Sequence, residues 1–167
     1  MVTLDTDRLM IRNFGPDDWR ALQKMIVVYQ ASESAKYEDP WPTSDADMKN
    51  IAGWFASGDN YLAVWLKDTA ALIGMIAIEP REGQEQRVHN LGYIFHPGYH
   101  GHGYATEGCR AAMDYLFGTL GVDRILTGTR LENRASVALL GRLGLRAIGN
   151  SEFTMSRDEW SGKRQES

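Results

Sequence analysis

The sequence of 167 residues has little cysteine, no long apolar run and no excess of positive charge. Its one cysteine, Cys109, excludes an internal disulfide and a cysteine-rich metal site. Cys109 has helical spacing from Ala105 and Ala112, so we expect a buried, small apolar side chain and not a nucleophile. A single thiol is typical of the reducing cytoplasm.

The apolar segments are short. The longest, 71–78, falls far below the roughly 20 residues that a membrane-spanning helix needs. The first residues do not form a basic segment followed by an apolar one, which is the pattern of a secretion signal. We therefore predict a cytoplasmic protein without membrane attachment.

Positive charge is outweighed, because 18 Lys and Arg stand against 22 Asp and Glu for a net charge of -4. Such a chain has no overall positive field to hold a nucleic acid backbone, so nucleic acid is excluded as an expected partner. The 43% of hydrophobic residues is typical of a globular protein, and the length predicts a single domain over 1–167.

Hydrophobic patterns along the chain predict a mixed α/β domain. Period-two patterns and β-branched or aromatic runs predict strands at 9–12, 61–67, 70–79, 88–95, 124–129 and 153–155, followed by a polar tail. Helical spacing and cap signals predict helices at 16–29, 44–55, 104–117 and 135–143. The three strands between 61 and 95 indicate an antiparallel meander.

The sharpest local feature is a glycine loop at 100–105, which contains Gly101 and Gly103 and lies between a strand and a helix. Glycines let a backbone approach a ligand closely, and free amides at a helix start favour an anion. This pattern predicts phosphate binding, although two glycines can also form a plain tight turn.

Two known phosphate loops fit poorly. A Walker loop needs Lys followed by Ser or Thr after its last glycine, where this chain has Tyr104 and Ala105. A dinucleotide fingerprint needs a third glycine where Thr106 stands, although Asp123 lies at the expected distance of about 20 residues from Gly103. Dinucleotide binding therefore stays as a remote alternative.

Several segments carry a resemblance in their order and spacing: 91–95, Pro97, 101–107, 133–136 and 143–144. In these segments the chain resembles the GNAT acetyltransferases. The segments 6–9, 17–19 and 159–160 are similar to the RimJ/RimL branch, which acetylates protein N-terminal amines. The resemblance extends from about residue 4 to 160.

The resemblance implies a mainly antiparallel sheet of six or seven strands with about four flanking helices, split between Phe95 and the strand near Arg124. Acetyl-CoA would lie in the split. Amides of the loop would hold its pyrophosphate, and amides of the strand would bind its pantetheine arm and thioester carbonyl. Asn133 would also contact the coenzyme arm, and Ser136 would protonate the departing thiolate. The implied coenzyme residues are His100, Gly101, His102, Gly103, Tyr104, Ala105, Tyr93, Ile94, Phe95, Asn133 and Ser136.

Three positions depart from the family pattern. Gly98 stands where the loop often has Gln or Arg, and Leu140 stands where many relatives have a proton-donating Tyr. Asn90 replaces an acid, so the base that deprotonates the acceptor is open. His89 and Glu79 are the candidates, each with a plain structural role as the alternative.

The segment 37–42 has acids and aromatics where relatives receive the acceptor. We expect Tyr37, Glu38, Asp39 and Trp41 to bind it, because acids attract a cationic amine. By resemblance the acceptor is a primary amine, most readily a protein or peptide N-terminus. A polyamine, an aminoglycoside-like amine or a coenzyme A binding module without catalysis are the alternatives.

The remaining expectations concern metal binding, the role of Glu107 and the oligomeric state. The histidines His96, His100 and His102 invite a metal site, but we expect none because zinc needs converging ligands with oriented partners. Glu107, in the first helical turn, is expected to balance the helix dipole. The sequence fits a monomer or a homodimer.

Overall fold

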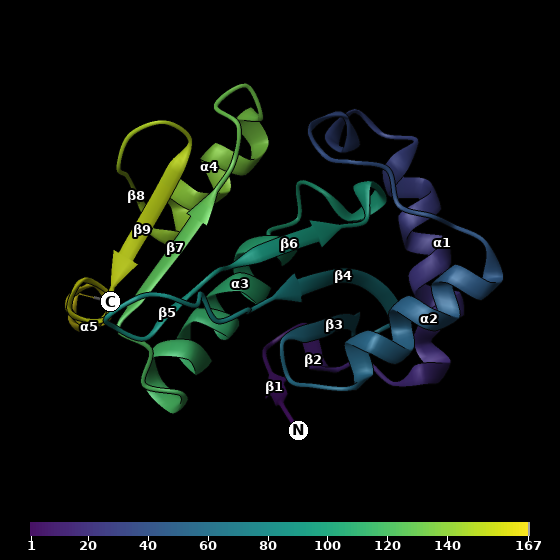
Figure 1. Ribbon diagram of the computed structural model, residues 1–167, viewed down its shortest axis with the longest axis horizontal. Helices are drawn as coiled ribbons and strands as arrows, with labels where there is room; N and C mark the ends of the chain where they lie inside the picture. Colours follow the sequence, from purple (N-terminus) through teal and green to yellow (C-terminus); the bar gives the residue numbers. More distant parts are fainter. Residues whose placement is uncertain (167) are drawn as a thin grey trace.

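The computed structural model describes residues 1–166 (Figure 1). The strands are β1 (Thr3–Asp5), β2 (Leu9–Asn13), β3 (Tyr61–Leu66), β4 (Ala71–Ala77), β5 (Val88–His89), β6 (Gly92–Phe95), β7 (Arg124–Gly128), β8 (Arg146–Ala147) and β9 (Glu152–Ser156). The helices are α1 (Trp19–Gln30), α2 (Asp45–Ala56), α3 (Tyr104–Asp114), α4 (Arg134–Leu143) and α5 (Arg157–Gln165). Shorter turns are η1 (Pro16–Asp18), η2 (Glu33–Tyr37), η3 (Pro97–Tyr99) and η4 (Tyr115–Thr119).

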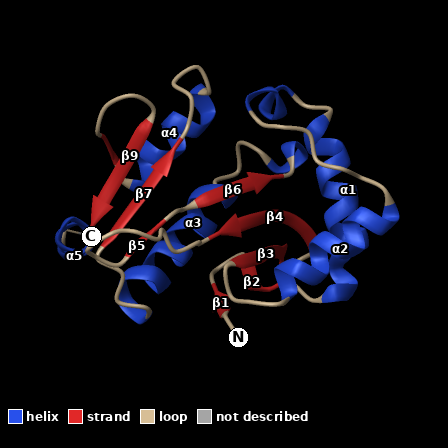
Figure 2. Cartoon of the chain, viewed as in Figure 1, coloured by secondary structure: helices blue, strands red, loops and turns tan. Residues whose placement is uncertain are grey.

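Within residues 1–166 the strands form two sheets (Figure 2). The five-stranded sheet has the order β1-β2-β3-β4-β6 and is antiparallel throughout. The four-stranded sheet has the order β5-β7-β9-β8, in which only β5 and β7 run parallel. The mixed α/β fold with a mainly antiparallel sheet is therefore confirmed.

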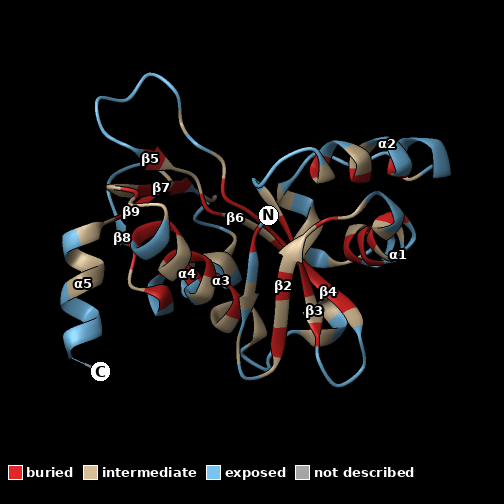
Figure 3. Cartoon of the chain, turned by 90° about the horizontal axis from the view of Figure 1, so that it is seen from below, coloured by how far each residue is buried: buried red, intermediate tan, exposed pale blue. Residues whose placement is uncertain are grey.

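Alternating side chains on β3 divide the core between the two faces of the larger sheet. Leu62 and Val64 pack in the cluster that includes residues of α3 and α4, while Ala63 packs with residues of α1 and α2. This alternation is the period of two that a strand imposes. Figure 3 shows the buried strands between the two groups of helices, with the outer surface of α2 exposed.

The two sheets separate within one stretch of chain. Strand β5 pairs with β7 through Val88 and His89 only, and the chain then continues as β6, which pairs with β4 instead. Strands β6 and β7 consequently diverge, as Figure 1 shows. Near the branch point, the Thr127 hydroxyl donates a buried 2.8 Å hydrogen bond to the Leu91 carbonyl. This bond links the diverging segments.

Several boundaries differ from the sequence prediction. The segment 88–95 is two strands in two sheets. The predicted meander holds for β3, β4 and β6, and β5 also bridges antiparallel to Pro80, but β5 pairs in addition with β7 of the second sheet. Strands β1 and β8 were not predicted, and the predicted polar tail is helix α5. Ser156 and Glu159 form a capping box that starts α5, with bonds of 3.1 and 2.7 Å. The predicted helix 104–117 ends as α3 and continues as the π-helical turn η4.

Two expectations about apolar residues can be compared with the structure. Cys109 is fully buried in the core, and burial raises the pKa of its thiol to about 12, which confirms the apolar role. Among residues 1–166, no helix combines the length and apolar character that a membrane span requires.

The bond between Thr127 and Leu91 generates a first prediction. Thr127→Val should reduce the free energy of unfolding by about 1–3 kcal/mol, because a buried carbonyl loses its donor. Thr154→Val is the matched control within the smaller sheet, since buried Thr154 donates a 2.8 Å bond to the Ile125 carbonyl. Urea unfolding should give comparable losses for both. A neutral Thr127→Val beside a destabilised Thr154→Val contradicts the linking role.

Candidate functional site

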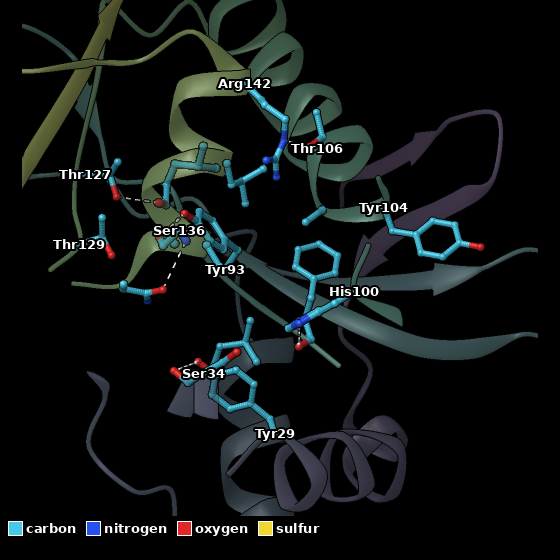
Figure 4. Close-up of a pocket in the computed structure, with 18 of the residues that line it drawn as sticks. Tyr29, Ser34, Tyr93, His100, Tyr104, Thr106, Thr127, Thr129, Ser136 and Arg142 are labelled. Carbon is cyan, nitrogen blue, oxygen red and sulfur yellow. Dashed lines mark hydrogen bonds between the residues drawn. The ribbon is translucent and has the colours of Figure 1, made fainter. Parts of the chain in front are cut away.

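A cavity of about 540 Å³ lies where β6 and β7 diverge. Its walls come from β6, from the glycine loop and the start of α3, from the end of β7, and from α4. Across from α4, residues of α1 and of the segment after it complete the walls, as Figure 4 shows with Tyr29 and Ser34 opposite Ser136. Three stretches of chain distant in sequence, 29–38, 90–106 and 127–142, therefore meet at one cavity.

Strand β6 contributes backbone groups to this cavity. Asn90 and His96 each donate a 2.8 Å backbone bond toward β4, to Glu79 and Ile73. Backbone amides of an antiparallel strand alternate between its two edges. The Ile94 amide therefore also faces β4, while the Tyr93 and Phe95 amides face the opposite edge. That edge is the one that β7 has left. The cavity therefore borders strand amides that have no neighbouring strand.

The glycine loop turns its backbone toward the same cavity. Gly101 and Gly103 have φ of 81° and 80°, in the left-handed region that glycine adopts without strain. Gly103 is the N-cap of α3, and no side chain caps the first amides of that helix. Residues 103–106 line the cavity. Free amides and the helix dipole make this end suitable for an anion.

Glu107 joins the start of α3 to the residues before β2. Its carboxylate accepts bonds of 2.6 Å from the Thr6 hydroxyl and 2.9 Å from the Arg8 amide, and it forms a 2.7 Å ion pair with the Arg8 side chain. Partial burial opposes ionisation, but these bonds together hold the pKa of Glu107 below its usual value. Arg8 also donates a 2.8 Å bond to the His102 carbonyl. Glu107 is thus a structural anchor in addition to a first-turn acid.

Arg142 supplies a cation that the sequence analysis missed. Its Nε donates a 3.3 Å bond to the Thr106 hydroxyl, and its side chain lines the cavity beside the start of α3 (Figure 4). The spacing of Ala135, Leu139 and Arg142 along one face of α4 was the sequence signal that could have identified Arg142.

The segment before the glycine loop has little room for a large residue at Gly98, since a Cβ there would lie 2.9 Å from the His96 ring.

A pair of hydroxyls lies in the middle of the cavity. The Tyr93 and Ser136 hydroxyls are 2.6 Å apart, and Figure 4 shows the two side chains together. Ser136 does not cap α4 with its hydroxyl, because Asn133 is the N-cap and accepts a 3.3 Å bond from the Ser136 amide. Burial raises the pKa of Tyr93, and the bond to Ser136 opposes that rise. The pair therefore stays protonated and can donate a proton.

The two predicted base candidates lie elsewhere. Glu79 accepts a hydrogen bond from the Tyr61 hydroxyl, and His89 donates through Nδ1 to the Ile78 carbonyl at 3.3 Å. Burial, together with the charge of Arg87, lowers the pKa of His89. Neither Glu79 nor His89 is among the residues that line the cavity. Their catalytic roles stay predictions that this geometry does not favour.

The predicted acceptor residues are divided between two hollows. Glu38 lines the main cavity and also a neighbouring hollow of about 440 Å³, which Asp39 and Trp41 line. Tyr37 lines neither, and its hydroxyl donates a 3.0 Å bond to the Glu132 carbonyl before α4. Tyr37 thereby connects the segment after α1 to the far wall of the cavity.

The histidines differ in the contacts that they make. The His100 ring lines the cavity, and its Nε2 donates a 3.1 Å bond to the Phe95 carbonyl, whereas the predicted His102 is not among the lining residues. His96 accepts a 2.9 Å bond from the Gly98 amide. Among the described residues 1–166, no group of three or more His, Cys, Asp or Glu is arranged to hold a metal ion.

The comparison with known families decides the class of the protein. The acetyltransferase (GNAT) domain matches residues 8–146. The chain belongs to the GNAT acetyltransferases. The uncharacterized N-acetyltransferase YnaD of Bacillus subtilis (strain 168) is 30% identical over 148 residues, which are 87% of this chain and 84% of that protein. The GNAT chain is therefore an N-acetyltransferase.

Solved structures agree on the GNAT fold. A putative ribosomal-protein-serine acetyltransferase from Vibrio cholerae superposes with a TM-score of 0.78 at 21% identity, covering 93% of this chain and 97% of that one. The spermidine N-acetyltransferase from Vibrio cholerae, solved with CoA and spermine, gives 0.76 at 18% identity, covering 93% and 99%. At these identities the likeness shows the fold alone.

The cavity fits the acetyl-CoA that GNAT enzymes use as acetyl donor. The free amides of α3, with Arg142 beside them, suit a pyrophosphate. The open edge of β6 offers amides and carbonyls to the amide groups of a pantetheine arm. The hydroxyl pair stands further along the same cavity. The anion site, the open strand edge and the hydroxyl pair thus correspond in turn to the pyrophosphate, the pantetheine arm and the thioester of acetyl-CoA.

The glycine loop generates a second prediction. Gly101→Val should weaken acetyl-CoA binding by more than about tenfold, because its side chain would occupy space needed by the pyrophosphate. Gly83→Val is the matched control, since Gly83 has φ of 75° and, like Gly101, open space where a Cβ would stand. Both variants bear similar backbone strain. Calorimetric titration should show a raised Kd for Gly101→Val alone; equal Kd values contradict the assignment.

Proposed function

We propose that the enzyme transfers an acetyl group from acetyl-CoA to a primary amine, most readily a protein or peptide N-terminus, by direct attack in a ternary complex. The observation that carries this is the cavity itself. It joins an anion-binding helix end and an open strand edge to an acidic segment on its opposite wall. A phosphate-bearing donor and a cationic acceptor can therefore occupy it together.

Backbone groups stabilise the transition state. The amides of residues 100–105 and the Arg142 guanidinium hold the pyrophosphate, and the open edge at Tyr93 and Phe95 holds the pantetheine arm. Attack of the amine builds negative charge on the thioester carbonyl oxygen. A fixed amide of β6 beside that oxygen stabilises the transition state more than the ground state.

The hydroxyl pair supplies the proton for the leaving thiolate. The Ser136 hydroxyl, 2.6 Å from that of Tyr93, donates toward the sulfur and recovers a proton from Tyr93. Tyr93 thereby takes the role of the tyrosine that is missing at Leu140, which is buried. A thiol with a pKa of about 8.5 leaves tolerably well without help, so this donation assists the reaction and is not obligatory.

A direct attack agrees with the state of Cys109. A two-step route would need a nucleophile in the cavity to carry the acetyl group. The thiol of Cys109 is fully buried and its pKa is raised, so it is neither ionised nor accessible. The amine therefore attacks the thioester itself.

A screen of acceptors tests the proposed function. Peptides that begin with Ala or Ser, spermidine and an amino sugar are each mixed with the enzyme and acetyl-CoA, and thiol release is measured. We expect the highest kcat/KM for a peptide. Preference for spermidine or the amino sugar favours a small-molecule acetyltransferase. Tight acetyl-CoA binding without turnover on any amine favours a coenzyme A binding module.

The hydroxyl pair generates a third prediction. Ser136→Ala should lower kcat about tenfold and leave the acetyl-CoA Kd unchanged, because only departure of the thiolate loses its donor. Tyr93→Phe should give a similar fall, and the double variant should fall little further because both act in one step. Steady-state kinetics on the Ala-initiated peptide measure this. A folded Ser136→Ala with wild-type kcat at every pH removes Ser136 from catalysis.

A further inference from the structure

Glu38 has a position in the cavity that no other acid shares. Among the residues 1–166 that line the main cavity, it is the one carboxylate. It reaches the cavity from the segment after α1. Tyr29 and Ser34, which precede it in the chain, lie opposite Ser136 in Figure 4. Arg142 and the start of α3 lie at the other end. The cavity thus has a cationic end for the donor and an anionic group near the acetyl site.

Glu38 also separates two spaces. Within residues 1–166, only Tyr29 and Glu38 belong to the walls of both the main cavity and the neighbouring 440 Å³ hollow. Asp39 and Trp41 line that hollow. Tyr29 and Glu38 thus form the wall that the two spaces share.

Tyr29 is a polar neighbour of Glu38. Tyr29 is buried on α1, its hydroxyl donates a 3.4 Å bond to the Ser34 carbonyl, and it interacts electrostatically with the Glu38 carboxylate. Glu38 is an exposed residue, and the side chains that line the cavity around it partly desolvate its carboxylate. Burial of the carboxylate raises the pKa of Glu38, and the nearby Tyr29 hydroxyl opposes that rise. Tyr29 therefore fixes the Ser34 end of the segment that carries Glu38.

The groups that face Glu38 come from three elements. Tyr29 of α1 and Tyr93 of β6 both interact electrostatically with it. In its own segment, Lys36 and Asp39 line the shared hollow, and Lys36 is paired with Glu33 at 3.2 Å. No other carboxylate enters the main cavity from residues 1–166. A cationic group that arrives there finds Glu38 as its counter-ion.

We propose that Glu38 receives the ammonium group of the acceptor and accepts the proton that this group must lose before attack. This rests on the proposed function and deepens it. Glu38 replaces Glu79 and His89 as the base, since those two lie outside the cavity. The acceptor class that follows is an amine that is cationic at neutral pH and enters through the hollow beside Asp39 and Trp41.

The step balances without a further reactant. One proton passes from the ammonium nitrogen to the Glu38 carboxylate, and the freed nitrogen electron pair forms the bond to the thioester carbon. The carbon–sulfur bond breaks, and the sulfur takes a proton from Ser136. The second nitrogen proton restores the Tyr93–Ser136 pair through solvent, and Glu38 releases its proton to water. The products are the amide, coenzyme A and one proton.

The test compares Glu38→Gln with Glu33→Gln, the same substitution on an exposed acid of the same segment that lines neither space. With an Ala-initiated peptide at pH 7, Glu38→Gln should lower kcat/KM at least about 100-fold with an unchanged acetyl-CoA Kd. Glu33→Gln should change kcat/KM less than about threefold. Glu38→Asp should restore part of the loss. Equal effects of the two Gln variants overturn the proposal.

The pH profile separates a base from a mere binding charge. The reactive pair is ionised Glu38 with a protonated amine, so wild-type kcat/KM should rise as pH passes the raised pKa of Glu38 and fall above the amine pKa of about 8. Glu38→Gln loses the base and reacts only with neutral amine. Its kcat/KM should rise continuously through pH 8. A wild-type profile of that rising shape contradicts proton transfer to Glu38.

A binding measurement keeps this outcome distinct from failure of the proposed function. Carbon-13 labelled glutamate carboxyls are observed by NMR in the enzyme with coenzyme A, and Glu38→Gln identifies the Glu38 signal. Addition of the Ala-initiated peptide, or of spermidine, should shift that signal. A shifted signal without turnover contradicts the proposed transfer alone. An unmoved signal in an enzyme that does acetylate the amine overturns the role of Glu38 alone.

Discussion

Among residues 1–166, strand β6 pairs with another strand along one edge only, the edge that faces β4. Strand β7 pairs with the preceding two-residue strand β5 and then diverges from the chain that forms β6. Polar backbone groups on a bare edge need hydrogen-bond partners, and water or a ligand must supply them. In the proposed mechanism this open edge is where the acetyl donor lies. The rest of the structure supports this edge, with Thr127 fixing the branch point and α3 and α4 covering one side.

The polar groups around this edge follow from where helices begin and end. Helix α3 begins at the glycine loop, so its positive end faces the cavity, and Glu107 with Arg8 fixes that helix start to β2. Helix α4 begins at Asn133, which caps the helix and so leaves the Ser136 hydroxyl available to Tyr93. Local capping thus leaves the Ser136 hydroxyl free for the proton donation that we propose.

Local signals predicted much of this arrangement. The glycine loop, the cap signal at residue 44 before α2 and the alternation of β2 are short-range patterns, and the structure places them as the sequence indicates. The closeness of Tyr93 to Ser136 and of Glu38 to the cavity could not be predicted in this way. Those contacts join residues far apart in sequence, and their distances depend on how β6 and β7 diverge.

Other differences have specific physical causes. Glu79 ends a strand and looked like a free acid, but its bond to Tyr61 keeps it outside the cavity. Arg142 lies in the last turn of α4, and its bond to Thr106 depends on the packing of α4 against α3. The sequence of α5 contains a capping box, but its polar composition favoured a tail over a helix. Charge and composition alone therefore do not predict where these residues lie.

Amide hydrogen exchange of β6, measured with and without coenzyme A, tests the central claim most directly. In the free enzyme the Tyr93 and Phe95 amides should exchange rapidly, whereas Ile94, which faces β4, should exchange slowly. Saturating coenzyme A should slow exchange at Tyr93 and Phe95 and leave Ile94 nearly unchanged. Unchanged exchange at Tyr93 and Phe95 in the saturated enzyme would contradict the claim that the open edge of β6 holds the coenzyme.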